Sequence, residues 1–198
     1  GMHFTDAYAA CPVCSPTRGA LLSGKYPSRL KLTNYIDWQR KRHPLRGRII
    51  DAPYIDRLPS NEKTLAASFR DQGYTTWHIG KWHLGPEPSY PEHHGFDVNI
   101  GGCEWGMPVK GYFAPSDLPN LSGRDVPEGT YLDDYLTDRA VELIRKTPSD
   151  KPFFMNLWYY LVHLPAQAKQ EDIAYFEEKA RKLGLDKQEA CEEGDFYT

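Results

Sequence analysis

The sequence has few cysteines, no long apolar run and no recognisable leader. Its four cysteines, Cys11, Cys14, Cys103 and Cys191, are too few for a disulfide scaffold in a chain of 198 residues. The longest apolar run, residues 153–162, is shorter than the roughly 20 residues that a membrane span needs. Residues 1–5 do not form the apolar core of a secretory signal. We therefore expect no membrane span and no disulfide-stapled fold.

The sequence also has no long run of basic residues, and its formal net charge is -3. This balance argues against a nucleic-acid partner, which would favour a basic face. One basic cluster does occur, but Pro44 and Gly47 interrupt it and aromatic residues are sparse within it. We interpret it as a solvated loop; it consists of Arg40, Lys41, Arg42, His43, Arg46 and Arg48.

The composition, 40% hydrophobic and 26% charged, suits a single globular domain with a core of its own. Helical periodicity predicts helices over 17–23, 61–72, 130–147 and 168–183, the first capped by Ser15 with Pro16 in its first turn. Nearly continuous apolar runs predict buried strands over 74–79 and 153–161. Residues 26–60 and 85–129 are expected to be largely irregular. This alternation predicts an α/β fold, with a mostly parallel sheet flanked by helices.

Polar residues follow both predicted strands directly, at 78–83 and at 161–163. Ligands of open α/β sheets bind outside the carboxyl ends of the strands. We therefore expect the binding site at this edge of the sheet.

The segment Cys14-Ser-Pro-Thr-Arg-Gly19 places a cysteine at the start of a predicted helix. The free N–H groups and the positive dipole end of a helix favour an anion and make a thiol more reactive. Arg18 adds a permanent charge with a geometry suited to an oxyanion. Taken alone, the segment fits equally well an ordinary cysteine in a capped helix.

Followed by Leu22-Ser-Gly-Lys-Tyr-Pro27, this segment resembles the signature of the formylglycine-dependent sulfatases, members of the alkaline phosphatase-like superfamily, in which C-x-P-x-R precedes a Thr/Ser-Gly step. Three further segments resemble family motifs in the same order: 73–85, 94–97 and 153–165. The departures are mild: Ser23 stands where many members have Thr, and Leu164 where Thr is common.

The resemblance implies that a formylglycine-generating enzyme oxidises Cys14 to an aldehyde, whose hydrate attacks the sulfur of a sulfate ester. Arg18 would orient and stabilise this group, and Lys81 and His83 would contact the sulfate and the leaving oxygen. His163 would donate to the sulfate or protonate the leaving group. Without the resemblance, Lys81 reads as an exposed strand-end lysine, and either histidine as a core residue.

The resemblance also implies a calcium ion, held in the family by an Asp-Asp pair after the first strand and an Asp-Asn pair far downstream. Neither pair occurs here, and Asp133-Asp134 is expected to be solvated helix surface. The first residues resemble a step inside the family domain. We therefore expect residues 1–198 to be a partial N-terminal catalytic domain lacking its metal-binding segments, and the isolated chain to hydrolyse sulfate esters weakly or not at all.

Two expectations concern the environment of the chain. Exposed sheet edges would favour oligomers. A full-length family member is expected in the periplasm or outside the cell.

Several alternatives stay open. The chain could be a non-catalytic fragment that at most binds anions, or a related phosphoesterase or phosphonate hydrolase. Cys11 and Cys14 could form a redox or zinc pair. The substrate, a sulfated small molecule or glycan, would be recognised by residues 26–57 and 101–129, where Trp38, Trp105, Tyr112 and Phe113 either stack on it or pack in the core.

Overall fold

A computed structural model describes residues 1–37, 52–121 and 126–185. The predicted basic cluster, Trp38 and Cys191 lie outside these residues. The chain divides into two compact units, 1–165 and 166–198. The first unit contains every predicted site residue, so its fold is the one that positions the site. In the described residues, no helix is both long enough and apolar enough to cross a membrane.

The first unit is built on a parallel sheet in the strand order β2-β1-β3. The central strand β1 (Thr75–Gly80) pairs with β2 (Val98–Ile100) on one side and β3 (Phe153–Trp158) on the other. Both predicted strands are confirmed, and so is the parallel α/β fold. The region 85–129 is more regular than predicted: it also contains β2 and the 3-10 helix η2 (Pro91–His94).

Among the described residues, four α-helices accompany this sheet: α1 (Cys14–Ser23), α2 (Pro27–Leu30), α3 (Leu65–Asp71) and α4 (Leu132–Lys146). The second unit contains α5 (Gln170–Leu183), which ends at Gly184 as predicted. The short helix α2 lies inside the stretch predicted to be irregular.

The prediction for the start of α1 is wrong. The helix begins at Cys14, its N-cap is Val13, and no side chain caps it. Ser15 lies inside the helix, fully buried, and its hydroxyl accepts the backbone N–H of Ile36 at 3.0 Å. The end is as predicted, because Gly24 adopts the left-handed conformation at φ 67° that terminates helices.

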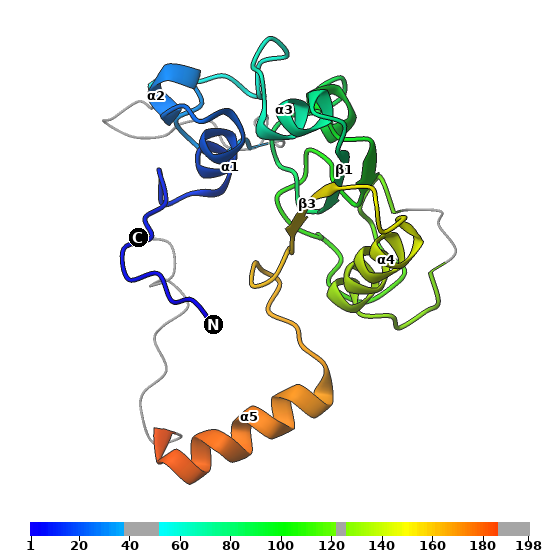
Figure 1. Ribbon diagram of the computed structural model, residues 1–198. Helices are drawn as coiled ribbons and strands as arrows, with labels where there is room; N and C mark the ends of the chain where they lie inside the picture. The colour runs from blue at the N-terminus through cyan, green and yellow to red at the C-terminus, as the bar shows by residue number, and fades with distance from the viewer. Residues whose placement is uncertain (38–51, 122–125, 186–198) are drawn as a thin grey trace. The chain divides into compact units, whose positions relative to one another are not determined.

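The side chains of β3 alternate between two core clusters, which cover the two faces of the sheet. Phe154 and Trp158 pack with residues of α1, α2 and α3, whereas Met155 and Leu157 pack with residues of α4. Figure 1 shows α1 and α3 on one side of β1 and β3, and α4 on the other. Burial on both faces explains why the strands read as continuous apolar runs.

The Asp133-Asp134 pair also departs from its prediction. Asp134 is exposed, but Asp133 is only 6% exposed, because the first turn of α4 buries Leu132 and Asp133 together. Burial raises the pKa of the Asp133 carboxyl to about 6, against the opposing effect of the Leu161 backbone; the charge of Asp134 adds to the rise. One of the two carboxylates is therefore part of the core.

Candidate active site

The Cys14 side chain lies where α1 begins and contacts groups that follow β1. Its Sγ is 3.1 Å from Nδ1 of His83, and the Lys81 ammonium interacts electrostatically with the same side chain. These residues are 67 and 69 positions apart in sequence, and the fold brings them together as the motif resemblance predicts.

His83 is held in a fixed orientation and is neutral. Its Nε2 lies 2.7 Å from the carbonyl oxygen of Ile36, and its backbone N–H donates to the Cys103 carbonyl at 3.0 Å. Burial, together with the positive charge of Lys81, lowers the His83 pKa to about 3. A carbonyl can only accept, so the single ring proton is on Nε2 and Nδ1 offers a lone pair to Cys14.

Two cations interact with Cys14. Lys81 is 3% exposed, and burial lowers its pKa to about 8. Arg18 donates from Nη1 to the Lys81 carbonyl at 2.9 Å, and burial lowers its pKa to about 10. Both side chains therefore carry positive charge at neutral pH. The alternative reading of Lys81 as an exposed strand-end lysine does not hold, because its side chain is buried and its backbone N–H continues the pairing with β3.

The described residues offer neither cation a carboxylate partner. Arg18 Nε is buried without a hydrogen-bond partner in the same part of the chain. A buried donor without an acceptor is costly, and a buried charge more so. The arrangement therefore fits a site completed by an anion.

His163 lies in the turn that follows β3. Its backbone N–H donates to the Tyr160 carbonyl at 3.1 Å, and its ring Nδ1 lies 3.3 Å from the Leu164 carbonyl. The ring is half-buried, and burial followed by the charges of Lys81 and Arg18 lowers its pKa. These electrostatic effects associate His163 with the same cationic site.

An open depression of about 350 Å³ surrounds the start of α1. Its lining is largely apolar apart from the helix end and Arg18: Cys11, Pro12, Val13, Cys14, Thr17, Arg18, Leu21 and Trp158. The guanidinium of Arg18 stacks on the Trp158 ring, with Cζ 4.6 Å from the ring centroid. A substrate would reach Cys14 through this opening.

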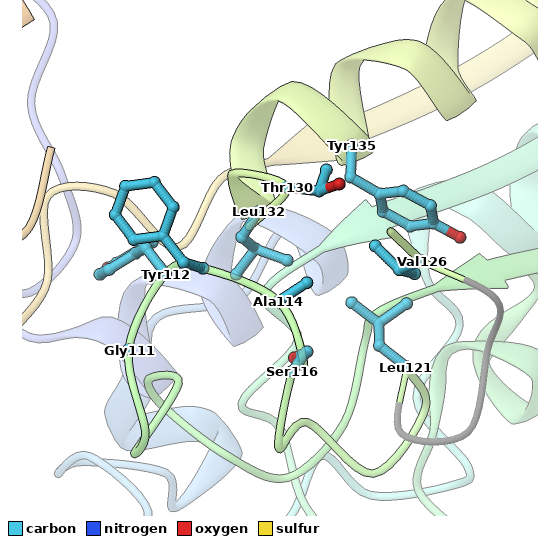
Figure 2. A pocket seen from close by; sticks show the side chains of 10 residues that line it. Gly111, Tyr112, Ala114, Ser116, Leu121, Val126, Thr130, Leu132 and Tyr135 are labelled. Carbon is cyan, nitrogen blue, oxygen red and sulfur yellow. The ribbon is translucent and has the colours of Figure 1, made fainter. Parts of the chain in front are cut away.

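A second, smaller pocket lies between residues 111–121 and the start of α4 (Figure 2). Tyr112, Leu121, Leu132 and Tyr135 contribute to its mostly apolar wall, and it contains none of the predicted catalytic residues. Tyr112 is 1% exposed, so it packs in the core and is not a stacking platform. Phe113 is 37% exposed and Trp105 is half-buried.

No three His, Cys, Asp or Glu side chains of the described residues converge on a metal site. Cys11 and Cys14 are both free thiols, and this part of the chain supplies no third ligand for zinc.

Sequence reasoning missed Trp158, Gly106 and the carbonyl of Ile36. A tryptophan at the end of a buried strand could have been noticed, since it adjoins the predicted ligand edge. A Cβ on Gly106 would lie 2.6 Å from Cε1 of His83, so a glycine is required there. The Ile36 carbonyl is a backbone group and has no side-chain signal in the sequence.

Comparison with known proteins agrees with this geometry. A family profile described as Sulfatase matches residues 1–187. Arylsulfatase G of Mus musculus is 31% identical over 197 residues, which cover 83% of this chain and 35% of that protein. N-acetylgalactosamine-6-sulfatase of Canis lupus familiaris is 28% identical over 193 residues, covering 86% and 34% respectively. The chain thus spans about a third of the length of these curated relatives.

Solved structures show the same architecture. The crystal structure of Ps i-CgsB superposes with a TM-score of 0.66 at 28% identity, covering 88% of this chain and 40% of that one. A complex of Ps i-CgsB with k-i-k-neocarrahexaose gives a TM-score of 0.63 at 29% identity, with the same coverage of both chains. The parallel sheet flanked by helices is that of the alkaline phosphatase-like fold of sulfatases.

Proposed function

Because this chain belongs to the sulfatase family, we propose that its site cleaves a sulfate monoester, with the residue derived from Cys14 as nucleophile. The observation that carries the proposal is the pair of cations, Lys81 buried and Arg18 partly buried, without carboxylate partners in the described residues and beside a side chain in contact with a neutral histidine. Such a pocket binds an anion and activates a nucleophile next to it.

His83 would take the proton of the nucleophile. The Cys14 Sγ stands where the oxygens of a formylglycine hydrate belong, and it faces the unprotonated Nδ1 of His83 at 3.1 Å. When present, the hydrate supplies one hydroxyl that attacks sulfur and a second that allows sulfate to be expelled. The sequence-based role of His83 is thereby shifted from contact with the leaving oxygen to contact with the nucleophile.

Lys81 and Arg18 would hold the sulfuryl oxygens. Their positive charges are fixed before the substrate arrives: Arg18 by its bond to the Lys81 carbonyl and its stacking on Trp158, and Lys81 by burial. Charges fixed in advance in a partly dry site stabilise a transition state without reorganisation. Arg18 Nε, which lacks a partner in the described residues, is suited to one of these oxygens.

His163 would protonate the leaving oxygen. Burial, followed by the charges of Lys81 and Arg18, lowers the pKa of His163, and an anionic ester between these groups would offset the repulsion by the two charges. Substrate binding would then favour the protonated imidazole that this donation requires. The described residues do not bring together the carboxylates that a calcium site requires.

A sulfated carbohydrate is the substrate class that we favour. The Ps i-CgsB complex contains a neocarrahexaose, and another relative is a sulfatase of N-acetylgalactosamine 6-sulfate by its name. The depression beside Cys14 is open, and its apolar wall of Pro12, Val13 and Leu21 can pack against a sugar ring.

The test uses the product of the complete gene, produced together with a formylglycine-generating enzyme. Aryl sulfate, aryl phosphate and aryl phosphonate are compared as substrates, followed by sulfated oligosaccharides, and mass spectrometry measures conversion of residue 14. We expect sulfate hydrolysis to dominate and Cys14→Ser to stop turnover, because serine has no second hydroxyl. Sulfate binding without turnover in the converted protein would support the alternative of a non-catalytic, anion-binding fragment. A preference for aryl phosphate or aryl phosphonate would support the alternative of a phosphoesterase or phosphonate hydrolase.

A further inference from the structure

Ser15, the residue after the nucleophile position, belongs to a closed ring of contacts around the active site. Its Oγ accepts the backbone N–H of Ile36 at 3.0 Å. The Ile36 carbonyl lies 2.7 Å from Nε2 of His83, and Nδ1 of His83 lies 3.1 Å from the Cys14 Sγ. The peptide bond between Cys14 and Ser15 closes the ring.

This ring fixes which nitrogen of His83 carries the proton. The Ile36 carbonyl has no proton to give, so it selects the form of the neutral ring that is protonated on Nε2. Only in this form can Nδ1 accept a proton from residue 14. A ring protonated on Nδ1 would present a donor to the nucleophile and could not act as its base.

Ser15 is the side chain that holds Ile36 in place. It is fully buried in the middle of the contacts between α1 and the segment of Ile36, and it does not cap the helix that contains it. Ile36 is 4% exposed, so water does not readily replace a lost partner of its N–H. If the hydroxyl is removed, the Ile36 backbone must move to find another acceptor, and its carbonyl moves with it.

The other sides of the imidazole are already occupied. The backbone of His83 adopts a positive φ of 56° and is bonded to the Cys103 carbonyl. Gly106 packs so closely on the ring that a Cβ there would approach Cε1 to 2.6 Å. The ring therefore cannot turn to follow a displaced carbonyl, and the contact with Ile36 is lost.

We infer that Ser15 is a positioning residue: through the backbone of Ile36, it keeps His83 in the proton-accepting orientation toward the nucleophile. Its effect on turnover rests on the proposed function, but its effect on the proton position of His83 does not. The two can therefore be measured separately.

The main variant is Ser15→Ala, and its matched control is Ser23→Ala. Ser23 lies in the same helix and also bonds to backbone, donating to the Gly19 carbonyl at 2.7 Å, away from His83. Both are made in the product of the complete gene, and rates are normalised to the converted fraction of residue 14. We expect Ser15→Ala to lower kcat about 10- to 100-fold with little change in KM, and Ser23→Ala to change kcat less than about twofold.

A readout that needs no turnover comes from nitrogen-15 NMR of the His83 ring, assigned with His83→Gln. The unsubstituted protein should show the form protonated on Nε2, Ser15→Ala a mixture with the other form, and Ser23→Ala no change. If Ser15→Ala leaves the proton on Nε2, the inference is overturned, whatever the activity.

A double variant separates positioning from general destabilisation. In a His83→Ala background, Ser15→Ala should cause no further loss of kcat, since the residue through which it acts is gone. An additive loss would contradict the inference. If the protein hydrolyses no sulfate ester at all, the proposed function fails, and the NMR result still decides the role of Ser15.

Discussion

Gly80 ends β1 at the point where the chain turns into the site, and its substitution by alanine tests whether the close approach of β1 and β3 positions Lys81. A Cβ at this position would lie 1.9 Å from the carbonyl oxygen of Trp158, and the backbone φ is 96°. That carbonyl also accepts the Lys81 N–H at 2.7 Å. The added methyl group must therefore push the two strand ends apart by about 1 Å, the misplacement that costs about 100-fold in a reaction.

The magnitude follows from three contributions. A positive φ costs a non-glycine residue about 1–2 kcal/mol. Loss of the bond between Lys81 and Trp158 costs about 1 kcal/mol. Overpacking against a backbone carbonyl adds about 1–3 kcal/mol. We expect Gly80→Ala to lower the free energy of unfolding by about 3–6 kcal/mol and to weaken sulfate binding, because the Lys81 carbonyl also anchors Arg18.

Gly73→Ala is the matched control. Gly73 has a φ of 84°, but no atom lies within 4 Å of the position of its Cβ. It carries the conformational cost alone, so its loss should be about 1–2 kcal/mol. Urea unfolding followed by tryptophan fluorescence measures both variants. If they lose the same stability, within about 0.5 kcal/mol, the close strand contact is not what positions Lys81.

Three further predictions concern single side chains. The pKa of Lys81, lowered to about 8 by burial, means that its charge is lost as pH rises through 8; sulfate binding followed by calorimetry should weaken above pH 8 by up to about tenfold per pH unit, and Lys81→Met should abolish this dependence. Burial raises the pKa of Asp133 to about 6, so the folded state is destabilised above pH 6, where the carboxyl is ionised, and this penalty disappears below about pH 4. Asp133→Asn should therefore stabilise the fold by about 1–2 kcal/mol at pH 7.5, whereas Asp134→Asn should change its stability by almost nothing. Thermal or urea unfolding at several pH values measures both effects. The buried Tyr112 hydroxyl donates to the His163 carbonyl at 2.8 Å, so Tyr112→Phe should lower the free energy of unfolding by about 1–2 kcal/mol and also lower kcat. An unchanged free energy of urea unfolding together with an unchanged kcat would contradict this prediction.

The parts of the fold that the sequence predicted are those with long, regular patterns. Strand β1 and helix α4 have apolar residues at the spacing of their own secondary structure, and the structure places them within two residues of the prediction. Strand β2 has three residues, too few to show any period, and its pairing with β1 exists only in the folded chain. The local sequence pattern therefore predicts long, periodic elements, and it misses short elements that form only by pairing with a neighbouring strand.

The same difference between local pattern and tertiary contact explains two further departures from prediction, at Ser15 and at Asp133. Ser15 stands where a helix cap would be expected, but its partner is Ile36, 21 residues away, and no local pattern announces that contact. Asp133 has a charged neighbour and a helical context typical of a solvated surface, yet packing of α4 on the sheet side buries it. In both cases a tertiary contact decided the environment of a polar residue.

The candidate site was easier to predict than these details, because its residues follow from topology as well as from motif. Strands β1 and β3 are adjacent and parallel, so the segments after them, with Lys81 and His83 on one and His163 on the other, emerge at the same edge. Lys81 interacts electrostatically with Cys14, at the start of α1. The motif resemblance named the residues, and the strand order explains why they meet.

The two positive charges at this edge of the sheet also affect the stability of the fold. Lys81 is buried and Arg18 partly so, and burial lowers the pKa of each, which means that the folded state disfavours their charged forms. A fold selected only for stability would pair them with carboxylates, and the described residues do not. An anion that binds the folded state alone should therefore return this stability, by about 2.7 kcal/mol at a concentration 100 times its Kd. The cost of burying these charges and their affinity for an anion therefore have the same physical origin.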